Sequence, residues 1–437
     1  MRPIPAINSN FAPERDGSWV KRRTGWRGCL VAGLAALAGS ALLAGCSVMP
    51  PDRPSEPPSP TTPTSVPTTP TPAPTASASV QPEESEPPTP SDEPELELCL
   101  AEAQAMSLDA RIGQLIMVGV TDGLDAAERK AITSYQLGSV VLLGNQSGGV
   151  ADTAALAAEL TALVPDAGML LSADQEGGVV QRLTGTGFRK IPSATKQAEL
   201  PLDSLQARAR NWGVELIEAG VQLNLAPVAD VVPAKKVKSN APIGKLNRGF
   251  GSDPELVAEK VRAVINGYSA AAVGTTVKHF PGLGEVVGNT DHASGVVDDV
   301  TTADSASLLP FRTAIETGVA AVMISSARYS KIDAKNQAVF SPKVIGLLRD
   351  WDYDGVVISD DLGAAVSVSK IPAGQRALRF LSAGGDVVIN ASPALVGPMV
   401  DAVKVEAGKD EAFAEQVTRS VARVLRMKQG LGIVSCG

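Results

Sequence analysis

The chain has 437 residues, of which 44% are hydrophobic and 4% are aromatic, and it carries a formal net charge of −8. A mildly acidic chain without a basic stripe is a poor nucleic-acid binder, so we expect no nucleic-acid partner.

Residues 1–45 have the pattern of a signal peptide rather than of a folded segment. A short apolar stretch over 29–43 is too short to span a membrane comfortably. It ends in Leu43-Ala44-Gly45-Cys46, which resembles the lipobox of bacterial lipoproteins. The resemblance implies cleavage before Cys46, lipidation of Cys46, and anchoring of the exported protein to the outer face of the cell membrane. The alternative is a secreted or membrane-anchored protein with a chance cysteine. The basic residues that precede the apolar stretch are Arg15, Lys21, Arg22, Arg23 and Arg27.

Residues 46–98 are dominated by Pro, Ser, Thr and Glu. Such a segment cannot bury enough apolar surface to offset its ordering entropy, so it is expected to be a disordered linker. We interpret it as a tether that holds the folded part, residues 99–437, away from the membrane.

The chain has four cysteines. If Cys29 leaves with the signal peptide and Cys46 carries the lipid, Cys99 and Cys436 remain at the two edges of the folded region. Outside the cytoplasm such a pair favours a disulfide, which requires a fold whose ends meet. The alternative is two free thiols.

The folded region alternates short apolar runs with helical patterns. The runs are apolar throughout rather than at every second residue, as expected for strands covered on both faces. This alternation predicts an α/β protein with a single (β/α)₈ TIM-type barrel, and the alternative is an open, doubly wound sheet. The expected strands are 115–120, 139–143, 169–173, 222–225, 275–278, 321–325, 355–359 and 386–389, and the clearest helices are 152–163, 254–271, 341–351 and 373–383.

Polar residues follow several of these strands directly. In barrel enzymes the chemistry lies on loops after the carboxyl ends of the strands, so these residues indicate a site. The only two histidines, His279 and His292, also fall within one Gly- and Pro-rich segment after the strand at 275–278. Histidine suits proton transfer and oriented hydrogen bonding near neutral pH, although two solvated loop histidines would be an equally simple interpretation of this pair alone.

Five ordered segments carry a family resemblance. Together they resemble glycoside hydrolase family 3, in its single-domain β-N-acetylhexosaminidase branch, over essentially all of residues 105–430. The segments are Asp174-Gln175-Glu176-Gly177-Gly178, Ala226-Pro227-Val228-Ala229-Asp230, Asn247-Arg248-Gly249-Phe250-Gly251, Lys278-His279-Phe280-Pro281-Gly282 and Ser359-Asp360-Asp361-Leu362.

The resemblance implies that Asp360 is the nucleophile of a retaining, two-step reaction with a covalent glycosyl-enzyme intermediate. A pair of carboxylates at a helix N-terminus is the structural alternative for Asp360 and Asp361. The resemblance also implies that a set of polar side chains holds the sugar, whereas a buried ion pair is the alternative for the two arginines. This set is Asp174, Arg182, Arg248, Lys278 and His279.

The acid/base residue is where the chain departs from the family pattern, an Asp-x-His dyad. Here Asp291 and His292 are adjacent. We favour His292 as the proton carrier with Asp291 as its partner. In the alternative, Asn289 and Asp291 occupy the dyad positions. Leu283 replaces a histidine that is usual in this glycine-rich loop.

Together these features predict an enzyme that releases terminal, non-reducing, β-linked N-acetylglucosamine from small glycans such as peptidoglycan fragments, without a metal or a cofactor. Beyond the signal peptide the only tryptophans are Trp212 and Trp351, which favours a small exo-acting pocket over a long cleft with aromatic platforms. We expect a monomer. The alternatives are a β-glucosidase of the same family and a non-catalytic glycan-binding lipoprotein.

Overall fold

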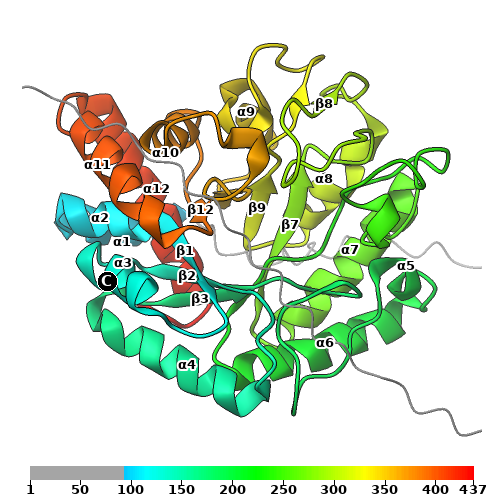
Figure 1. The fold of residues 1–437 in the computed structure, drawn as a ribbon, viewed down its shortest axis with the longest axis horizontal. Coiled ribbons are helices and arrows are strands. Elements are labelled where there is room, and N and C mark those ends of the chain that lie inside the picture. Colours follow the sequence, from blue (N-terminus) through cyan, green and yellow to red (C-terminus); the bar gives the residue numbers. More distant parts are fainter. Residues whose placement is uncertain (1–92) are drawn as a thin grey trace, which may run out of the picture. The chain divides into compact units, whose positions relative to one another are not determined.

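Eight parallel strands lie at the centre of the computed structural model, which describes residues 93–437 (Figure 1). Every one of the eight predicted strands is present, with ends that differ by a few residues from those expected. The strands are β1 (Ile116–Thr121), β2 (Ser139–Leu143), β3 (Leu170–Ala173), β6 (Leu223–Asn224), β7 (Gly274–Phe280), β9 (Ala321–Ile324), β11 (Val356–Ser359) and β12 (Val388–Asn390).

The sheet closes on itself. Each strand pairs in parallel with its neighbours in chain order, and β12 returns to pair with β1 through Ile116 and Val388. An isolated parallel bridge between Ile358 and Val387 joins β11 to the residue before β12. The predicted (β/α)₈ barrel is therefore confirmed, and the open, doubly wound sheet is wrong.

Helices surround the strands, as Figure 1 shows. The four helices expected from periodicity are confirmed as α4 (Gly149–Leu163), α7 (Pro254–Ser269), α9 (Pro342–Arg349) and α10 (Ala373–Ser382). Side-chain caps define several helix starts; Asp125, for example, accepts from the amide of Glu128 while Glu128 accepts from the amide of Asp125. The helices of the outer layer are α2 (Leu108–Gln114), α3 (Ala126–Ser134), α4 (Gly149–Leu163), α5 (Ala194–Gln197), α6 (Leu202–Glu218), α7 (Pro254–Ser269), α8 (Leu309–Glu316), α9 (Pro342–Arg349), α10 (Ala373–Ser382), α11 (Val396–Ala407) and α12 (Glu411–Gly430).

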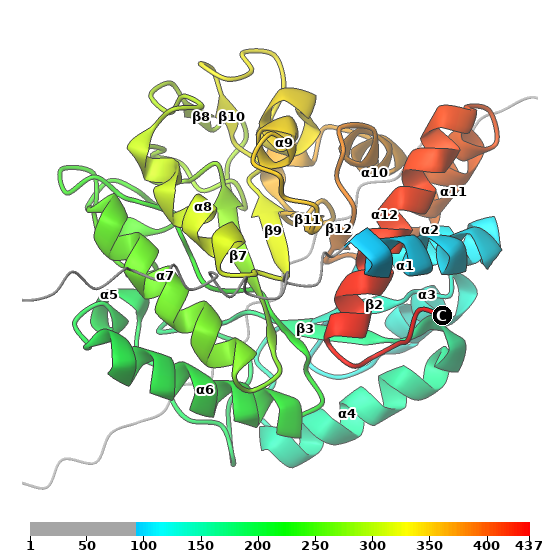
Figure 2. The same ribbon diagram turned by 180° about the vertical axis from the view of Figure 1, so that it is seen from behind.

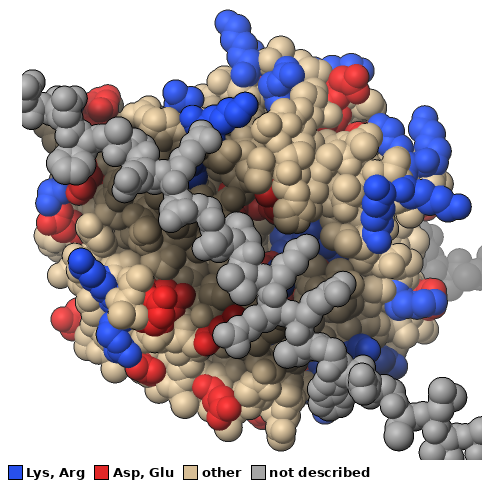
Figure 3. Space-filling model, viewed as in Figure 1, with Lys and Arg blue, Asp and Glu red and all other residues tan. Residues whose placement is uncertain are grey.

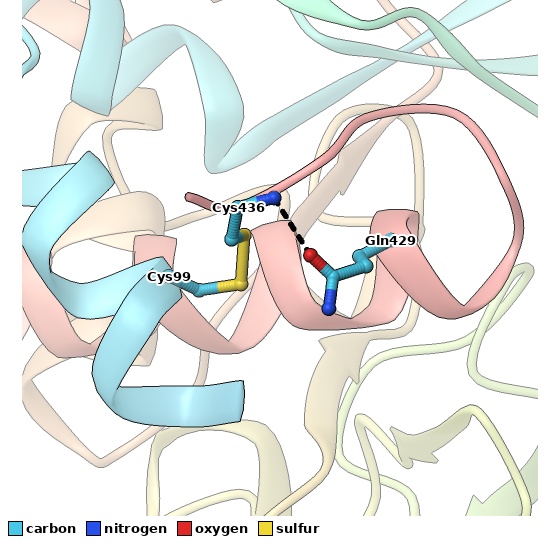
Figure 4. The surroundings of a disulfide bond; sticks show 3 residues. All are labelled: Cys99, Gln429 and Cys436. Atoms are coloured by element: carbon cyan, nitrogen blue, oxygen red, sulfur yellow. Dashed lines mark hydrogen bonds between the residues drawn. A yellow bond between two sulfur atoms is a disulfide. The ribbon is translucent and has the colours of Figure 1, made fainter. Parts of the chain in front are cut away.

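The two ends of the described chain meet behind the barrel. Helix α1 (Glu93–Ala105) packs against α12 (Figure 2). A disulfide joins Cys99 on α1 to Cys436, and the amide of Cys436 donates to Gln429 Oε1 at 2.7 Å (Figure 4). The predicted pairing is confirmed, and the alternative of two free thiols is wrong. Helix α1 begins at Glu93, so its first residues belong to the segment 46–98 that composition predicts to be a linker. The helix is held there because Leu96 and Leu100 pack against the hydrophobic core.

The predicted signal peptide (1–45), the lipidation site Cys46 and the linker up to residue 92 lie outside the described residues. Within residues 93–437, no helix is both long enough and apolar enough to cross a membrane.

Candidate active site

A pocket of about 460 Å³ opens at the carboxyl ends of the strands, and every predicted catalytic and sugar-holding side chain lines it. Its size is in the range of small-molecule sites. Loops that are distant in sequence therefore bring these residues together, as the barrel predicts. The predicted residues in its lining are Asp174, Arg182, Arg248, Lys278, His279, Asp291, His292 and Asp360.

A cluster of four charged side chains lies at one wall of the pocket, and three of them, Asp174, Arg248 and Lys278, line it. Lys278 Nζ lies 2.6 Å from Asp174 Oδ1 and 2.6 Å from Glu176 Oε1. Arg248 donates to both carboxylate oxygens of Glu176, from Nη2 at 2.7 Å and from Nε at 2.8 Å. The buried ion pair that was the alternative for Arg248 is thus present, while Arg248 also lines the pocket. Arg248 can therefore take part in the ion pair and still face a ligand.

The cluster fixes the charge of its members. Burial alone would raise the pKa of Glu176, but the charges of Arg248 and Lys278 hold it well below its usual range. Burial alone would lower the pKa of Lys278, but the carboxylates of Asp174 and Glu176 raise it. Lys278 and Arg248 are therefore cations and Glu176 is an anion at any working pH, so the wall keeps a constant charge pattern.

A short hairpin carries Asp174 and Arg182. Its strands are β4 (Gln175–Gly177) and β5 (Val180–Gln181), and the amide of Arg182 donates to the carbonyl of Asp174 at 3.1 Å. Gly177 has a φ of +100°, and a Cβ there would lie 2.3 Å from the carbonyl oxygen of Pro192, so the turn requires glycine. Arg182 Nε is buried and has no hydrogen-bond partner among residues 93–437, and the Arg182 side chain lines the pocket.

Asp230 orients His279. Its carboxylate is fully buried and accepts from the amides of His279 at 3.1 Å and Leu283 at 2.8 Å. Asp230 Oδ2 also lies 2.8 Å from His279 Nδ1. Because a carboxylate oxygen accepts, Nδ1 carries the proton of this contact, and the contact fixes the orientation of the imidazole ring. His279 itself lies on β7, not in the loop after it as the sequence predicted, because β7 continues to Phe280 past a register shift.

Glu176 and Asp230 were not among the predicted site residues, although both belong to the segments that carry the family resemblance. The structure makes them the carboxylates that position Lys278, Arg248 and His279. The sequence signal that could have identified them is the position of each carboxylate a few residues after the end of a buried strand. The partner of such a carboxylate comes from another strand, and the sequence does not show it.

Asp360 follows β11 directly. Its amide donates to the carbonyl of Ile324 at 3.0 Å, and its carboxylate accepts from the amide of Asp361 at 2.9 Å. Ser326 Oγ lies 3.5 Å from Asp360 Oδ2. Burial and, after it, the charge of Asp291 raise the pKa of Asp360 to about 6, and His279 opposes the shift. The carboxylate of Asp291 therefore lies within electrostatic reach of Asp360.

Asp361 has a structural role. Its carboxylate accepts from the amides of Gly363 at 2.7 Å, Ala364 at 2.9 Å and Ala391 at 2.9 Å. These contacts tie the loop after β11 to the loop after β12. No helix begins at this point, so the alternative of a helix N-terminal pair is wrong.

The loop that carries Asp291 and His292 is attached to the segment that follows Asp360. The carbonyls of Thr290 and Asp291 accept from the amides of Ser367 and Val366, each at 3.1 Å. Asp291 and His292 are exposed at the pocket mouth, and within the described structure no hydrogen bond joins their side chains. Both remain candidates for the proton carrier.

A closed parallel barrel with carboxylates and cations gathered at its carboxyl edge is the arrangement of a barrel enzyme that acts on a small polar substrate. The chain matches the model of the glycosyl hydrolase family 3 N terminal domain over residues 107–427, and it belongs to this family. It is therefore a glycoside hydrolase, and its substrate is a carbohydrate.

Similar proteins agree with this membership. The β-hexosaminidase LpqI of Mycobacterium tuberculosis is 31% identical over 337 residues, covering 73% of this chain and 82% of the relative. A β-hexosaminidase of Xanthomonas oryzae is 34% identical over 302 residues, covering 66% and 87%. The crystal structure of a β-N-acetylhexosaminidase from Beutenbergia cavernae superposes with a TM-score of 0.73 at 44% identity, covering 74% of this chain and 99% of that one.

Replacing Glu176 by Ala is expected to destabilise the fold by about 3–5 kcal/mol, because it removes a buried partner from two cations. The free energy of unfolding in urea measures this. The matched control is Glu199→Ala, which removes the partner of Lys196 in a pair whose side chains are 67% and 61% exposed. The control should cost less than about 1 kcal/mol. Equal small losses in both variants would contradict the role assigned to Glu176.

Proposed function

We propose that the enzyme is a retaining exo-glycosidase that releases terminal, non-reducing, β-linked N-acetylglucosamine from small glycans, in particular peptidoglycan fragments. The observation that carries the proposal is the partly buried carboxylate of Asp360 at a strand end, in a pocket whose lining also holds Asp174, Lys278 and Arg248. The names of the similar β-hexosaminidases support the choice of sugar.

In this mechanism Asp360 attacks the anomeric carbon and forms a covalent bond to it. The bond to the leaving oxygen breaks, and that oxygen takes a proton from His292, with Asp291 as the partner of the imidazole. Water then gives its proton back to His292 and displaces Asp360, so the configuration at the anomeric carbon is retained. A pKa of about 6 leaves Asp360 ionised, and therefore nucleophilic, at neutral pH.

The charged wall suits the task of holding a sugar ring. A carboxylate such as Asp174 accepts from hydroxyls, whereas Arg182, Arg248 and Lys278 donate to oxygens at any working pH. His279, with Nδ1 held by Asp230, presents its other nitrogen as an oriented polar group. Together they would bind the terminal sugar, including its acetamido group.

We place the enzyme outside the cell, attached to the outer face of the membrane by a lipid on Cys46 and separated from it by the linker. This proposal rests on the sequence of residues 1–92 alone. We expect the enzyme to act as a monomer.

The purified protein is expected to hydrolyse nitrophenyl N-acetyl-β-glucosaminide much faster than the matching β-glucoside. Asp360→Ala should lower kcat by at least about 10³-fold, because it removes the nucleophile. Asp304→Ala, which changes an exposed aspartate outside the pocket lining, is the control. Faster glucoside turnover would favour the β-glucosidase alternative. Binding without turnover, unaffected by Asp360→Ala, would favour a non-catalytic protein.

Replacing the proton carrier should matter chiefly for poor leaving groups, because a good leaving group departs without protonation. His292→Ala is therefore expected to lower kcat/KM by about 10²-fold or more on an alkyl or sugar aglycone, and far less on a dinitrophenyl aglycone. The comparison with Asp291→Ala decides between the two residues. If only Asp291→Ala shows this dependence on the leaving group, the assignment of His292 is wrong.

The acid limb of kcat/KM is expected near pH 6, since Asp360 must be ionised and burial raises its pKa to about 6. Activity falls as the pH drops through that value. Asp291→Asn removes a nearby negative charge, so it should move the limb to lower pH when measured with a dinitrophenyl substrate. Asp304→Asn should leave the limb in place. A limb that does not move in Asp291→Asn would contradict the proximity of these two carboxylates.

A further inference from the structure

A second cavity, of about 840 Å³, lies beside the active-site loop and has a basic lining. Four of its lining residues are cations: Arg328, Lys335, Lys370 and Arg379. The rest of the lining is neutral, with no aspartate or glutamate among the residues that form it. We call this cavity the basic groove. Figure 3 shows Lys and Arg side chains on the part of this face that Figure 1 labels α9 and α10.

The cations of the basic groove are not neutralised by the protein. Within residues 93–437, none of the four forms an ion pair with a carboxylate. The nearest carboxylate in sequence is Asp333, which is buried and already accepts from Ser341 Oγ at 2.7 Å and Asn336 Nδ2 at 2.9 Å. A concave surface lined by one sign of charge concentrates ligands of the opposite sign, so the groove suits an anion.

The groove lies next to the loop that carries Asp291 and His292. Ser294, Gly295 and Val296, which continue the loop of Asp291 and His292, line one side of it. Ser367 lines it too, and its hydroxyl donates to Ser326 Oγ at 3.0 Å. Ser326 Oγ in turn lies 3.5 Å from Asp360 Oδ2, so two serine side chains connect the groove lining to the proposed nucleophile.

Hydrogen bonds from Gln337 hold the part of the groove that contains Ser367 against the segment of Ser326. Gln337 Nε2 donates to the carbonyl of Ser326 at 2.7 Å and to that of Ser367 at 3.2 Å. Gln337 is itself part of the lining. The groove and the pocket around Asp360 are therefore fixed relative to each other by hydrogen bonds, as two adjoining binding sites would need to be.

We propose that the basic groove binds a carboxylate-bearing leaving-group portion of the substrate, such as a sugar acid that carries a short acidic peptide. This inference rests on the proposed exo-glycosidase function. The pocket of about 460 Å³ holds the terminal sugar, so the rest of the glycan must leave through the pocket mouth, where Asp291 and His292 lie. Carboxylates that extend past this loop reach unpaired Arg and Lys side chains, which bind them by charge-assisted hydrogen bonds.

The test compares two substrates that differ only in charge. One is a glycopeptide in which N-acetylglucosamine is β-linked to a muramyl sugar bearing a short peptide with free carboxylates, and the other is the same compound with those carboxylates amidated. The ratio of their kcat/KM values is measured for the full chain and for Lys335→Glu/Lys370→Glu. We expect the preference for the free acid to fall by about ten-fold in the variant, mainly through KM, and to weaken in high salt.

The matched control is Lys130→Glu/Arg208→Glu, which changes the net charge equally at exposed cations outside the groove. This control should keep the preference. If the control loses it as well, long-range attraction explains the effect and the groove is not a binding site. An unchanged ratio in the groove variant would also overturn the inference. A protein that cleaves neither compound, nor the nitrophenyl N-acetylglucosaminide, would instead refute the proposed function itself.

Discussion

The site depends on the buried ion cluster in which Glu176 binds Arg248 and Lys278 at the same time. A buried carboxylate is costly unless it is paired, and here the pairing joins the hairpin after β3, the loop around Arg248 and strand β7. Asp230 extends this arrangement by holding His279 and the start of the following loop. The pocket wall is therefore built from charges that fix one another, which gives a sugar a preformed surface.

Asp360 differs from these charges because no Lys, Arg or His side chain of residues 93–437 forms an ion pair with it. Burial and the charge of Asp291 raise its pKa to about 6, so its ionised form is less stabilised than that of Glu176. A carboxylate that is ionised at neutral pH but weakly solvated is a better nucleophile than one held in a tight ion pair. The barrel thus separates a fixed, fully paired set of charges for binding from a poised carboxylate for chemistry.

The sequence allowed the barrel to be predicted because its strands are continuous apolar runs followed by polar residues, such as 356–359 before Asp360. The disulfide could be predicted because Cys99 and Cys436 remain at the two edges of the folded region, and closure of the barrel brings those edges together. What the sequence did not show is pairing between strands. The spacing of residues along the sequence does not predict the contact of Glu176 with Arg248 or that of Asp230 with His279. Likewise, Arg328 and Arg379 are far apart in the sequence, and only the fold brings them to the same groove.

The central claim is that Asp360 attacks the sugar. Incubation with a 2-fluoro glycosyl inhibitor, followed by peptide mapping, tests it directly, because the fluorine slows release of the covalent intermediate. The account predicts one labelled carboxylate, at Asp360, and loss of labelling in Asp360→Ala. Label on Asp361 or Asp174 would contradict it.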